Sequence, residues 1–220
     1  MTSTPSQAAD RTRHVELRLA LSDSTNVLIR PLVREDRHLL QLGFEHLSEQ
    51  SRYFRFLIRR TELSEAELDF LTAANEPDHV ALGALDLSTD PPRPMGIARF
   101  VRSSAAPDEA EFAITLADRY QSRGLGTILL GVLTNLAEKT GYRAIQALVH
   151  AQNGPMLALL RHGGAELSPA SSGEVRARLG VHDLPASYPA NSTGKRMLQG
   201  WHAAQAAMDR VAVSEQAGSG

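Results

Sequence analysis

Alternating or continuous apolar positions mark several short stretches of the chain as strands. Between Val15 and Leu21 every odd position is apolar, and the positions between include Glu16 and Arg18, which is typical of a strand with one buried face. The first two strands, joined by a turn cluster, form a predicted hairpin. The predicted strands cover Val15–Leu21, Val27–Arg30, Val80–Leu87, Met95–Arg102, Glu109–Leu116, Ala144–Val149 and Glu174–Val181.

A helical period appears between these strands. It is clearest from Leu125 to Leu136, where apolar residues recur at i, i+3, i+4, i+7, i+8 and i+11. Gly141 follows, as expected at a helix end, and Ser64 with Glu67 forms a capping-box pattern at the start of a shorter helix. Further helices are predicted from Glu35, over 48–56, from Pro155 to Gly163 and over Met197–Val211.

The mixed order of strands and helices predicts an α/β or α+β fold with a largely antiparallel central sheet flanked by helices. A chain of 220 residues is expected to form one main domain with extensions. We assign residues 13–185 to that domain and 186–213 to a C-terminal helical extension. The polar ends, 1–12 and 214–220, are expected to be disordered.

Composition excludes several classes of function. The chain has no cysteine, which rules out disulfides, thiolate zinc sites and a thiol nucleophile. The histidines are too scattered to form a ligand pair, so no metal site is predicted. No apolar run is long enough to span a membrane, and the N-terminus lacks the apolar segment of a secretory signal, so we expect a soluble cytoplasmic protein. A net charge of −2 disfavours nucleic acid as a partner.

The segment from Gln121 to Thr127 is the strongest candidate for a binding site. Gly124 and Gly126 open the longest predicted helix, where unpaired amides and the helix dipole favour an anion. A glycine-containing helix start with no ligand is the alternative. A P-loop is excluded because no Lys-Ser/Thr pair follows Gly126, and a dinucleotide fingerprint is excluded because position 129 is leucine.

The motif Gln121-x-x-Gly124-x-Gly126 resembles the acetyl-CoA-binding motif of the GNAT superfamily of N-acetyltransferases. Ile29-Arg30-Pro31 with Glu35-Asp36 resembles the family's first strand and helix, and Asn153-x-x-Met156 resembles its second cofactor-contacting helix. The likeness extends over Val27–Leu167. Segments 47–56 and 110–113 further resemble the bacterial protein-lysine acetyltransferase branch.

This resemblance implies a GNAT-like fold and acetyl-CoA as cosubstrate. Backbone amides near Ile114 and Leu116 would bind pantetheine and the reaction's oxyanion, and amides from Ser122 to Thr127 would bind the pyrophosphate. Asn153 would contact pantetheine, and it also suits a helix N-cap. The implied cofactor-binding residues are Ile114, Leu116, Gln121, Ser122, Arg123, Gly124, Leu125, Gly126, Thr127 and Asn153.

A carboxylate is needed to deprotonate an amine before it attacks a thioester. The resemblance places Glu111 beside the cofactor groove, which makes it the candidate general base. Glu109 shares its face of the strand and is the reserve candidate, and a purely solvated role for Glu111 is the alternative. Many GNAT enzymes use a tyrosine to protonate the leaving thiolate, but this chain has Leu160 there, so water is the expected acid.

The expected acceptor is a primary amine, and the branch resemblance implies a protein lysine. A small-molecule amine and a catalytically silent acyl-CoA-binding module remain as alternatives. The cluster from Arg52 to Arg55 either contacts the acceptor or places aromatics in the core and arginines in water, with Phe54 expected in the core. The protein is expected to be a monomer or homodimer.

Overall fold

A computed structural model describes residues 14–56, 58, 60–73, 78–181 and 184–218. Of the two ends expected to be disordered, 1–12 lies entirely outside the described residues and 214–220 lies outside them only at 219–220. The strands are β1 Leu17–Ala20, β2 Asn26–Pro31, β3 His79–Asp86, β4 Arg93–Arg102, β5 Glu109–Leu116, β6 Ala144–His150, β7 Glu166–Pro169 and β8 Glu174–Gly180. The α-helices are α2 Arg37–Glu45, α3 Glu49–Phe56, α4 Glu65–Thr72, α5 Leu125–Thr140, α6 Gly154–His162 and α7 Ser192–Gly218.

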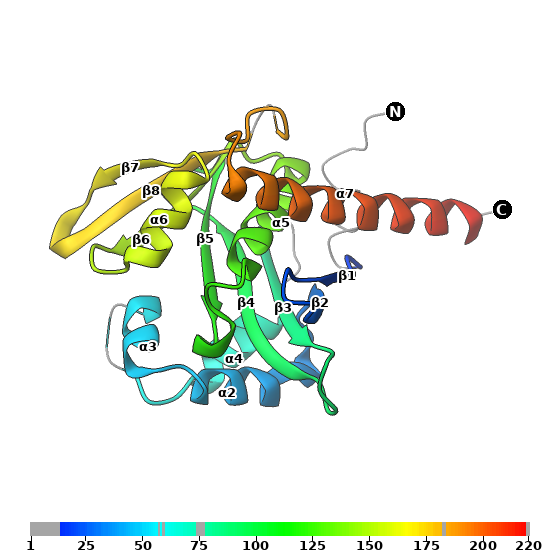
Figure 1. Cartoon of the computed structure of the whole chain (residues 1–220), viewed down its shortest axis with the longest axis horizontal. Coiled ribbons are helices and arrows are strands. Elements are labelled where there is room, and N and C mark those ends of the chain that lie inside the picture. The colour runs from blue at the N-terminus through cyan, green and yellow to red at the C-terminus, as the bar shows by residue number, and fades with distance from the viewer. Residues whose placement is uncertain (1–13, 57, 59, 74–77, 182–183, 219–220) are drawn as a thin grey trace.

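All strands join one 8-stranded sheet in the order β1-β2-β3-β4-β5-β6-β8-β7. Every neighbouring pair is antiparallel except β5 and β6, which run parallel. The predicted class, a mixed fold with a largely antiparallel sheet flanked by helices, is therefore confirmed (Figure 1). The parallel pairing extends only from Glu109↔Ala144 to Glu111↔Gln146, so the two strands diverge beyond Glu111 (Figure 1).

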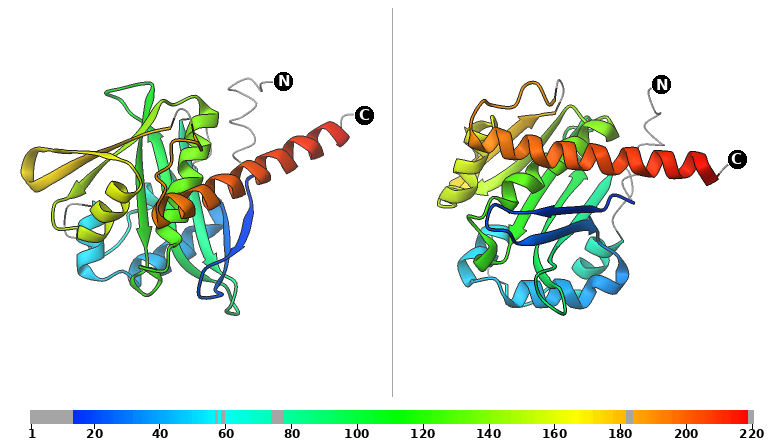
Figure 2. Two further views of the ribbon diagram at one scale, coloured as in Figure 1. Left: turned by 45° about the horizontal axis from the view of Figure 1, so that its top comes forward. Right: turned by 45° about the vertical axis from the view of Figure 1, so that its right-hand side comes forward.

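The helices cover the sheet from both sides (Figure 2). On one side α5 packs between the sheet and α7, and its residues from Leu125 to Ala137 are all buried. This side holds the larger core, which includes Phe100, Phe112 and Met197. On the other side α2 and α4 contribute Leu40 and Leu68 to a smaller cluster with Ala81 of β3. The alternation of β5 thus directs Phe112 and Ile114 toward α5, and Glu111 and Thr115 toward the opposite side.

Helices α5 and α7 cross at very short range. A Cβ atom added to Gly200 would lie 2.1 Å from the carbonyl oxygen of Ile128, and one added to Gly131 would lie 2.0 Å from that of Met197. The two glycines therefore let the backbones touch. Because Met197, Ala204 and Met208 belong to the main core, the apolar face of α7 is covered by its own chain. Its distal end projects past the sheet (Figure 1).

The structure differs from the sequence expectations in two elements. Strand β7 was not predicted, because Glu166–Pro169 is short, polar and ends in proline, and it is held only by pairing with β8. Helix α7 continues to Gly218, whereas the extension was expected to end at 213 and a disordered tail to begin at 214. Residues 214–217, Ser-Glu-Gln-Ala, include good helix formers that continue a helix anchored upstream.

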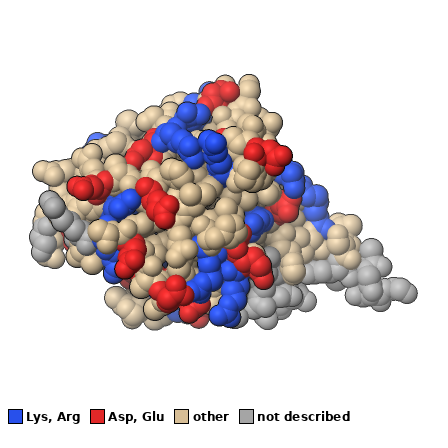
Figure 3. Space-filling model, turned by 90° about the horizontal axis from the view of Figure 1, so that it is seen from below, with Lys and Arg blue, Asp and Glu red and all other residues tan. Residues whose placement is uncertain are grey.

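The surface carries interleaved charges of both signs. Figure 3 shows basic and acidic side chains alternating over one face with no broad area of a single sign, as a net charge of −2 suggests. Within the described residues no helix combines the length and apolar character needed to cross a bilayer.

Candidate active site

A cleft of about 1230 Å³ opens where β5 and β6 diverge. Its walls come from β5, the start of α5, the end of β6, the start of α6 and helix α3. Eight of the ten predicted cofactor-binding residues line it. These are Ile114, Leu116, Gln121, Ser122, Gly124, Gly126, Thr127 and Asn153. The predicted base, Glu111, lies in the same cleft.

The start of α5 forms a cradle of backbone amides. Ser122 and Gly124 have φ angles of 60° and 88°, a left-handed conformation that glycine adopts freely and serine only at some cost in free energy. Gly124 is the N-cap residue and provides no side-chain cap, so the first amides of the helix have no intrahelical acceptor. Such amides, together with the helix dipole, suit a phosphate.

Two residues of the predicted cofactor set direct their side chains elsewhere. Arg123 forms an ion pair with Asp23, with Nη1 3.2 Å from Oδ2. Leu125 is fully buried in the main core. At Leu125 only the main chain can face a ligand, and at Arg123 the side chain is engaged at the surface by Asp23.

The side chain of Gln121 holds the loop in place. Its Nε2 donates to the Leu116 carbonyl oxygen at 3.2 Å and to Asp118 Oδ1 at 2.9 Å. Asp118 in turn accepts hydrogen bonds from the Ser48 amide at 2.6 Å and from the Ser51 hydroxyl at the start of α3. The side-chain amide of Gln121 is therefore hydrogen-bonded within the protein, and through Asp118 it connects the loop before α5 to α3.

Asn153 both caps α6 and lines the cleft, and these are the two roles that the sequence suggested for it. Its Oδ1 accepts a hydrogen bond of 3.2 Å from the Met156 amide and so caps α6, while the residue also lines the cleft. Leu160, which occupies the position of the usual tyrosine, is fully buried in the main core. It offers no group to protonate a thiolate.

Glu111 is exposed to the cleft and held by a chain of hydrogen bonds from three other segments. The Ser103 hydroxyl donates to Glu111 Oε1 at 3.2 Å, Gln146 Nε2 donates to Ser103 Oγ at 3.2 Å, and Arg176 Nη1 donates to Gln146 Oε1 at 3.2 Å. Ser103 is only 1% exposed. By contrast, Glu109 forms an ion pair with Arg178 at 2.7 Å and does not line the cleft. The arrangement favours Glu111 over the reserve candidate.

The arginine and aromatic residues of α3 lie differently from the expected core arrangement. Phe54 is half-buried and lines the cleft, where its ring stacks on His150 with centroids 5.5 Å apart. Tyr53 contacts the same His150 ring edge-on at 5.3 Å. The expectation that Phe54 belongs to the core was wrong, because this face of α3 forms a wall of the cleft.

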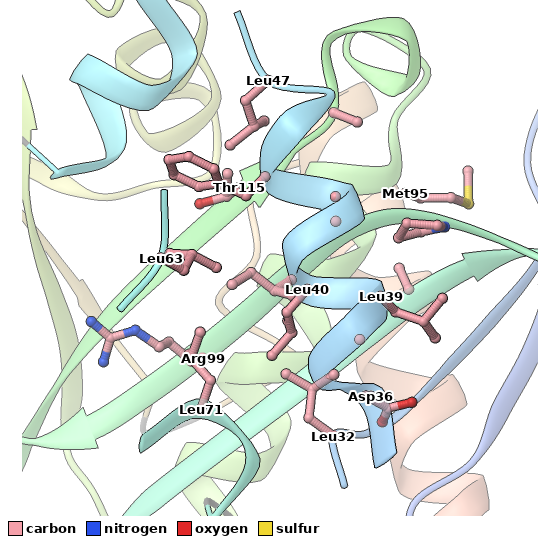
Figure 4. A pocket seen from close by; sticks show the side chains of 18 of the residues that line it. Leu32, Asp36, Leu39, Leu40, Leu47, Leu63, Leu71, Met95, Arg99 and Thr115 are labelled. Carbon is pink, nitrogen blue, oxygen red and sulfur yellow. The ribbon is translucent and has the colours of Figure 1, made fainter. Parts of the chain in front are cut away.

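The sequence marked Arg55, within the 52–55 cluster, as a residue that could contact an acceptor, but it gave no sign of Arg99, which lines the same cleft. Arg99 of β4 lies directly across from Ala113 in the register of β4 and β5, on the face that carries Glu111 and Thr115. Arg55 of α3 joins it, and both arginines line the cleft. They also border a second, apolar cavity of about 300 Å³ beneath α2 and α4 (Figure 4). No motif marks this group, because its members come from separate elements.

Comparisons with known proteins identify the family and agree with the fold. Residues 26–166 match the model of the acetyltransferase (GNAT) domain family. An acetyltransferase of Pseudomonas aeruginosa is 35% identical over 137 residues, which cover 62% of this chain and 73% of that protein. The crystal structure of the GNAT domain of Streptomyces lividans PAT is similar with a TM-score of 0.69 and 27% identity, over 76% of this chain and 97% of that domain. The Salmonella typhimurium protein yncA, solved with its cofactor acetyl-CoA, has the same fold with a TM-score of 0.58 and 18% identity, over 75% of this chain and 99% of that protein.

Proposed function

The chain belongs to the GNAT acetyltransferase family, and we propose that it moves an acetyl group from acetyl-CoA to a primary amine, with Glu111 as general base. One observation carries this assignment. Among the described residues lining the cleft, Glu111 is the only carboxylate that accepts a hydrogen bond from a buried side chain, that of Ser103, and it lies where β5 and β6 separate.

The proposed cofactor contacts follow from groups that the fold leaves unpaired. The first amides of α5, from Ser122 to Thr127, would bind the pyrophosphate. The edge of β5 beyond Glu111, which is not paired with β6, would bind pantetheine through the amides of Ile114 and Leu116. The acetyl-CoA bound to the Salmonella relative supports this use of the fold.

The proposed chemistry is direct attack. A lysine-like amine with a pKa of about 10.4 is protonated at neutral pH, so Glu111 first accepts a proton from it, directly or through water. The nitrogen then bonds to the acetyl carbon, and the C–S bond breaks with its electron pair on sulfur. The ammonium loses two protons in all. One ends on the CoA thiolate, delivered by water because Leu160 cannot supply it, and the other is released to solvent.

The acceptor is the less constrained part of the proposal. The likeness of segment 47–56 to protein-lysine acetyltransferases supports a lysine side chain. A small-molecule amine is supported by a different observation, the two arginines beside a small apolar cavity. A silent acyl-CoA-binding module would use the same cleft without turnover.

Calorimetric titration with acetyl-CoA and free CoA tests the proposal, followed by turnover with lysine peptides and small amines. Released CoA can be followed with a thiol reagent, because the chain has no cysteine to react. Micromolar binding with turnover is expected. Binding without turnover on any amine would identify a silent module, and no binding by folded protein would overturn both interpretations.

A further inference from the structure

Two arginines from separate elements meet where the cleft adjoins the apolar cavity. Arg55, near the end of α3, and Arg99, on β4, line both spaces. Their recorded contacts with the described part of the chain are aromatic: the guanidinium of Arg55 lies 5.0 Å from the centre of the Phe56 ring, and that of Arg99 lies 5.5 Å from Phe70. Neither forms a hydrogen bond or ion pair with a described residue, and Arg99 Nε is buried without a partner.

Neighbouring arginines on the same side of the sheet do have carboxylate partners. Arg30 binds Asp36 through two bonds of 2.7 Å, and Arg60 binds Glu67 at 2.5 Å and 2.6 Å. Arg37 is likewise paired with Glu65 and Asp69. Arg55 and Arg99 differ from these arginines in having no hydrogen-bonded carboxylate among the described residues, although Glu67 and Glu111 also line the two spaces.

The surroundings of the two guanidinium groups disfavour their charge. Burial lowers the pKa of Arg55 to about 10, and the positive charge of Arg99 adds to that shift. Burial also lowers the pKa of Arg99, while the negative charge of Glu111 acts in the opposite direction. Two like charges in a poorly solvated wall are unfavourable unless an anion binds between them. A carboxylate is a suitable anion, because the planar guanidinium group matches it in a two-bond geometry.

We propose, on the basis of the function proposed above, that the acceptor is a small amino-acid-like amine whose carboxylate is bound by Arg55 and Arg99. The register supports the placement. Arg99 lies across from Ala113, and Glu111 is two residues further along the same face, about 7 Å away along the strand. A carboxylate at Arg99 and an amine directed toward Glu111 are thus only a few bonds apart, as in an amino acid.

The apolar cavity provides space for the acceptor's side chain. Its walls include Leu40, Leu63 and Leu71, and Figure 4 shows the Arg99 guanidinium directed away from these leucines. The charged end and the apolar cavity are therefore separate parts of one site. The lysine side chain of a protein acceptor would bring no carboxylate into the site, so Arg55 and Arg99 would remain without a bound anion.

The test compares two acceptors, L-leucine and L-leucinamide, that differ in the charge of the carboxyl group. Each is supplied with acetyl-CoA, and kcat/KM is expressed per fraction of free amine. A lysine-containing peptide serves as a third acceptor. We expect leucine to be preferred over leucinamide by about tenfold or more, as a charge-assisted hydrogen-bonded pair allows. Arg55→Gln and Arg99→Gln should each remove this preference by raising the KM for leucine, with the KM for acetyl-CoA unchanged. Arg102→Gln, on the same strand but paired with exposed Asp78, should keep the preference.

Equal use of leucine and leucinamide, or a preference for the peptide, would overturn the inference while leaving the acetyltransferase proposal intact. An equal loss of activity toward leucine and toward leucinamide in Arg99→Gln would also overturn it. If no amine is acetylated, the proposed function fails, and thermal unfolding with CoA present decides the inference separately. A rise in Tm with leucine but not leucinamide, absent in Arg99→Gln, supports the carboxylate site, and equal rises refute it.

Discussion

The hydroxyl of Ser103 donates a 3.2 Å hydrogen bond to Oε1 of Glu111 and accepts one of 3.2 Å from Gln146. Ser103 follows β4, Gln146 is on β6, and both flank β5. The carboxylate is therefore oriented by one neutral donor, Ser103, which Gln146 in turn holds in place, and Glu111 lines the cleft. Such support is what a proton acceptor needs to keep one orientation without being neutralised by an ion pair.

Glu111→Gln should lower kcat by about 10²–10⁴-fold, the usual contribution of a general base. The amide keeps the size of the side chain and can still accept the Ser103 hydrogen bond, so folding and acetyl-CoA affinity should be unchanged. Steady-state rates and calorimetric titration measure these quantities. Unchanged kcat would remove Glu111 from the mechanism.

Glu109→Gln is the matched control on the same face of β5. It breaks the ion pair with Arg178 and should lower stability by about 1 kcal/mol, because the Arg178 end of the pair is partly exposed to solvent. Its kcat should stay within about twofold of wild type. A large loss of kcat here would instead favour the reserve candidate.

Ser103→Ala should reduce kcat by a smaller factor, about three- to tenfold, because it removes one neutral hydrogen bond from the base. The loss should disappear when Glu111 is already glutamine, since the hydroxyl acts through that carboxylate. A double-mutant cycle on kcat measures this coupling. Additive losses in the double variant would show that Ser103 affects the enzyme by another route.

The sequence predicted most of the fold because its elements have strong local signals. The period of α5 and the alternation of β5 are both visible in the chain, and both elements lie close to where they were expected. The cofactor-binding loop could be predicted for a similar reason. Gln121, Gly124 and Gly126 are contiguous, so one short motif includes most of the cradle.

The approach of Arg99 to Arg55 could not be predicted in the same way, although the 52–55 cluster was recognised as a candidate acceptor contact. Arg55 and Arg99 are far apart in the chain, and their approach depends on the register of β4 with β5 and on how α3 packs. No local pattern encodes either. The hydrogen bond between Ser103 and Glu111 depends on the same register. Strand β7 escaped prediction because pairing with β8, rather than its own composition, makes it a strand.

Gly200→Ala should lower the free energy of unfolding by about 2–3 kcal/mol, the usual effect of overpacking. The added Cβ would lie 2.1 Å from the Ile128 carbonyl oxygen, so α7 must move away from α5. For a chain of this length we expect Tm to fall by roughly 5–10 °C, measured by thermal denaturation. Gly154→Ala, whose Cβ would meet nothing within 4 Å, should leave Tm within about 2 °C. Equal Tm values for the two variants would contradict the close crossing.

His79 should make stability depend on pH in the mildly acidic range. Burial, and then the charge of Arg99, lowers its pKa from 6.5 to about 4, while its ring stacks on Phe70 with centroids 4.2 Å apart. Between pH 6.5 and 4 the unfolded chain binds a proton at this residue that the folded protein does not bind. The contribution of neutral His79 is thus complete above pH 6.5 and is lost as the pH falls toward 4, by about 3 kcal/mol at most.

His79→Phe keeps the ring contact and cannot titrate. Urea unfolding of both proteins at pH 7.5 and pH 4.5 isolates the effect, because acidic groups common to both cancel in the difference. The wild type should lose more stability than His79→Phe over this interval, and equal losses would show that His79 is protonated as readily in the folded state as in the unfolded one.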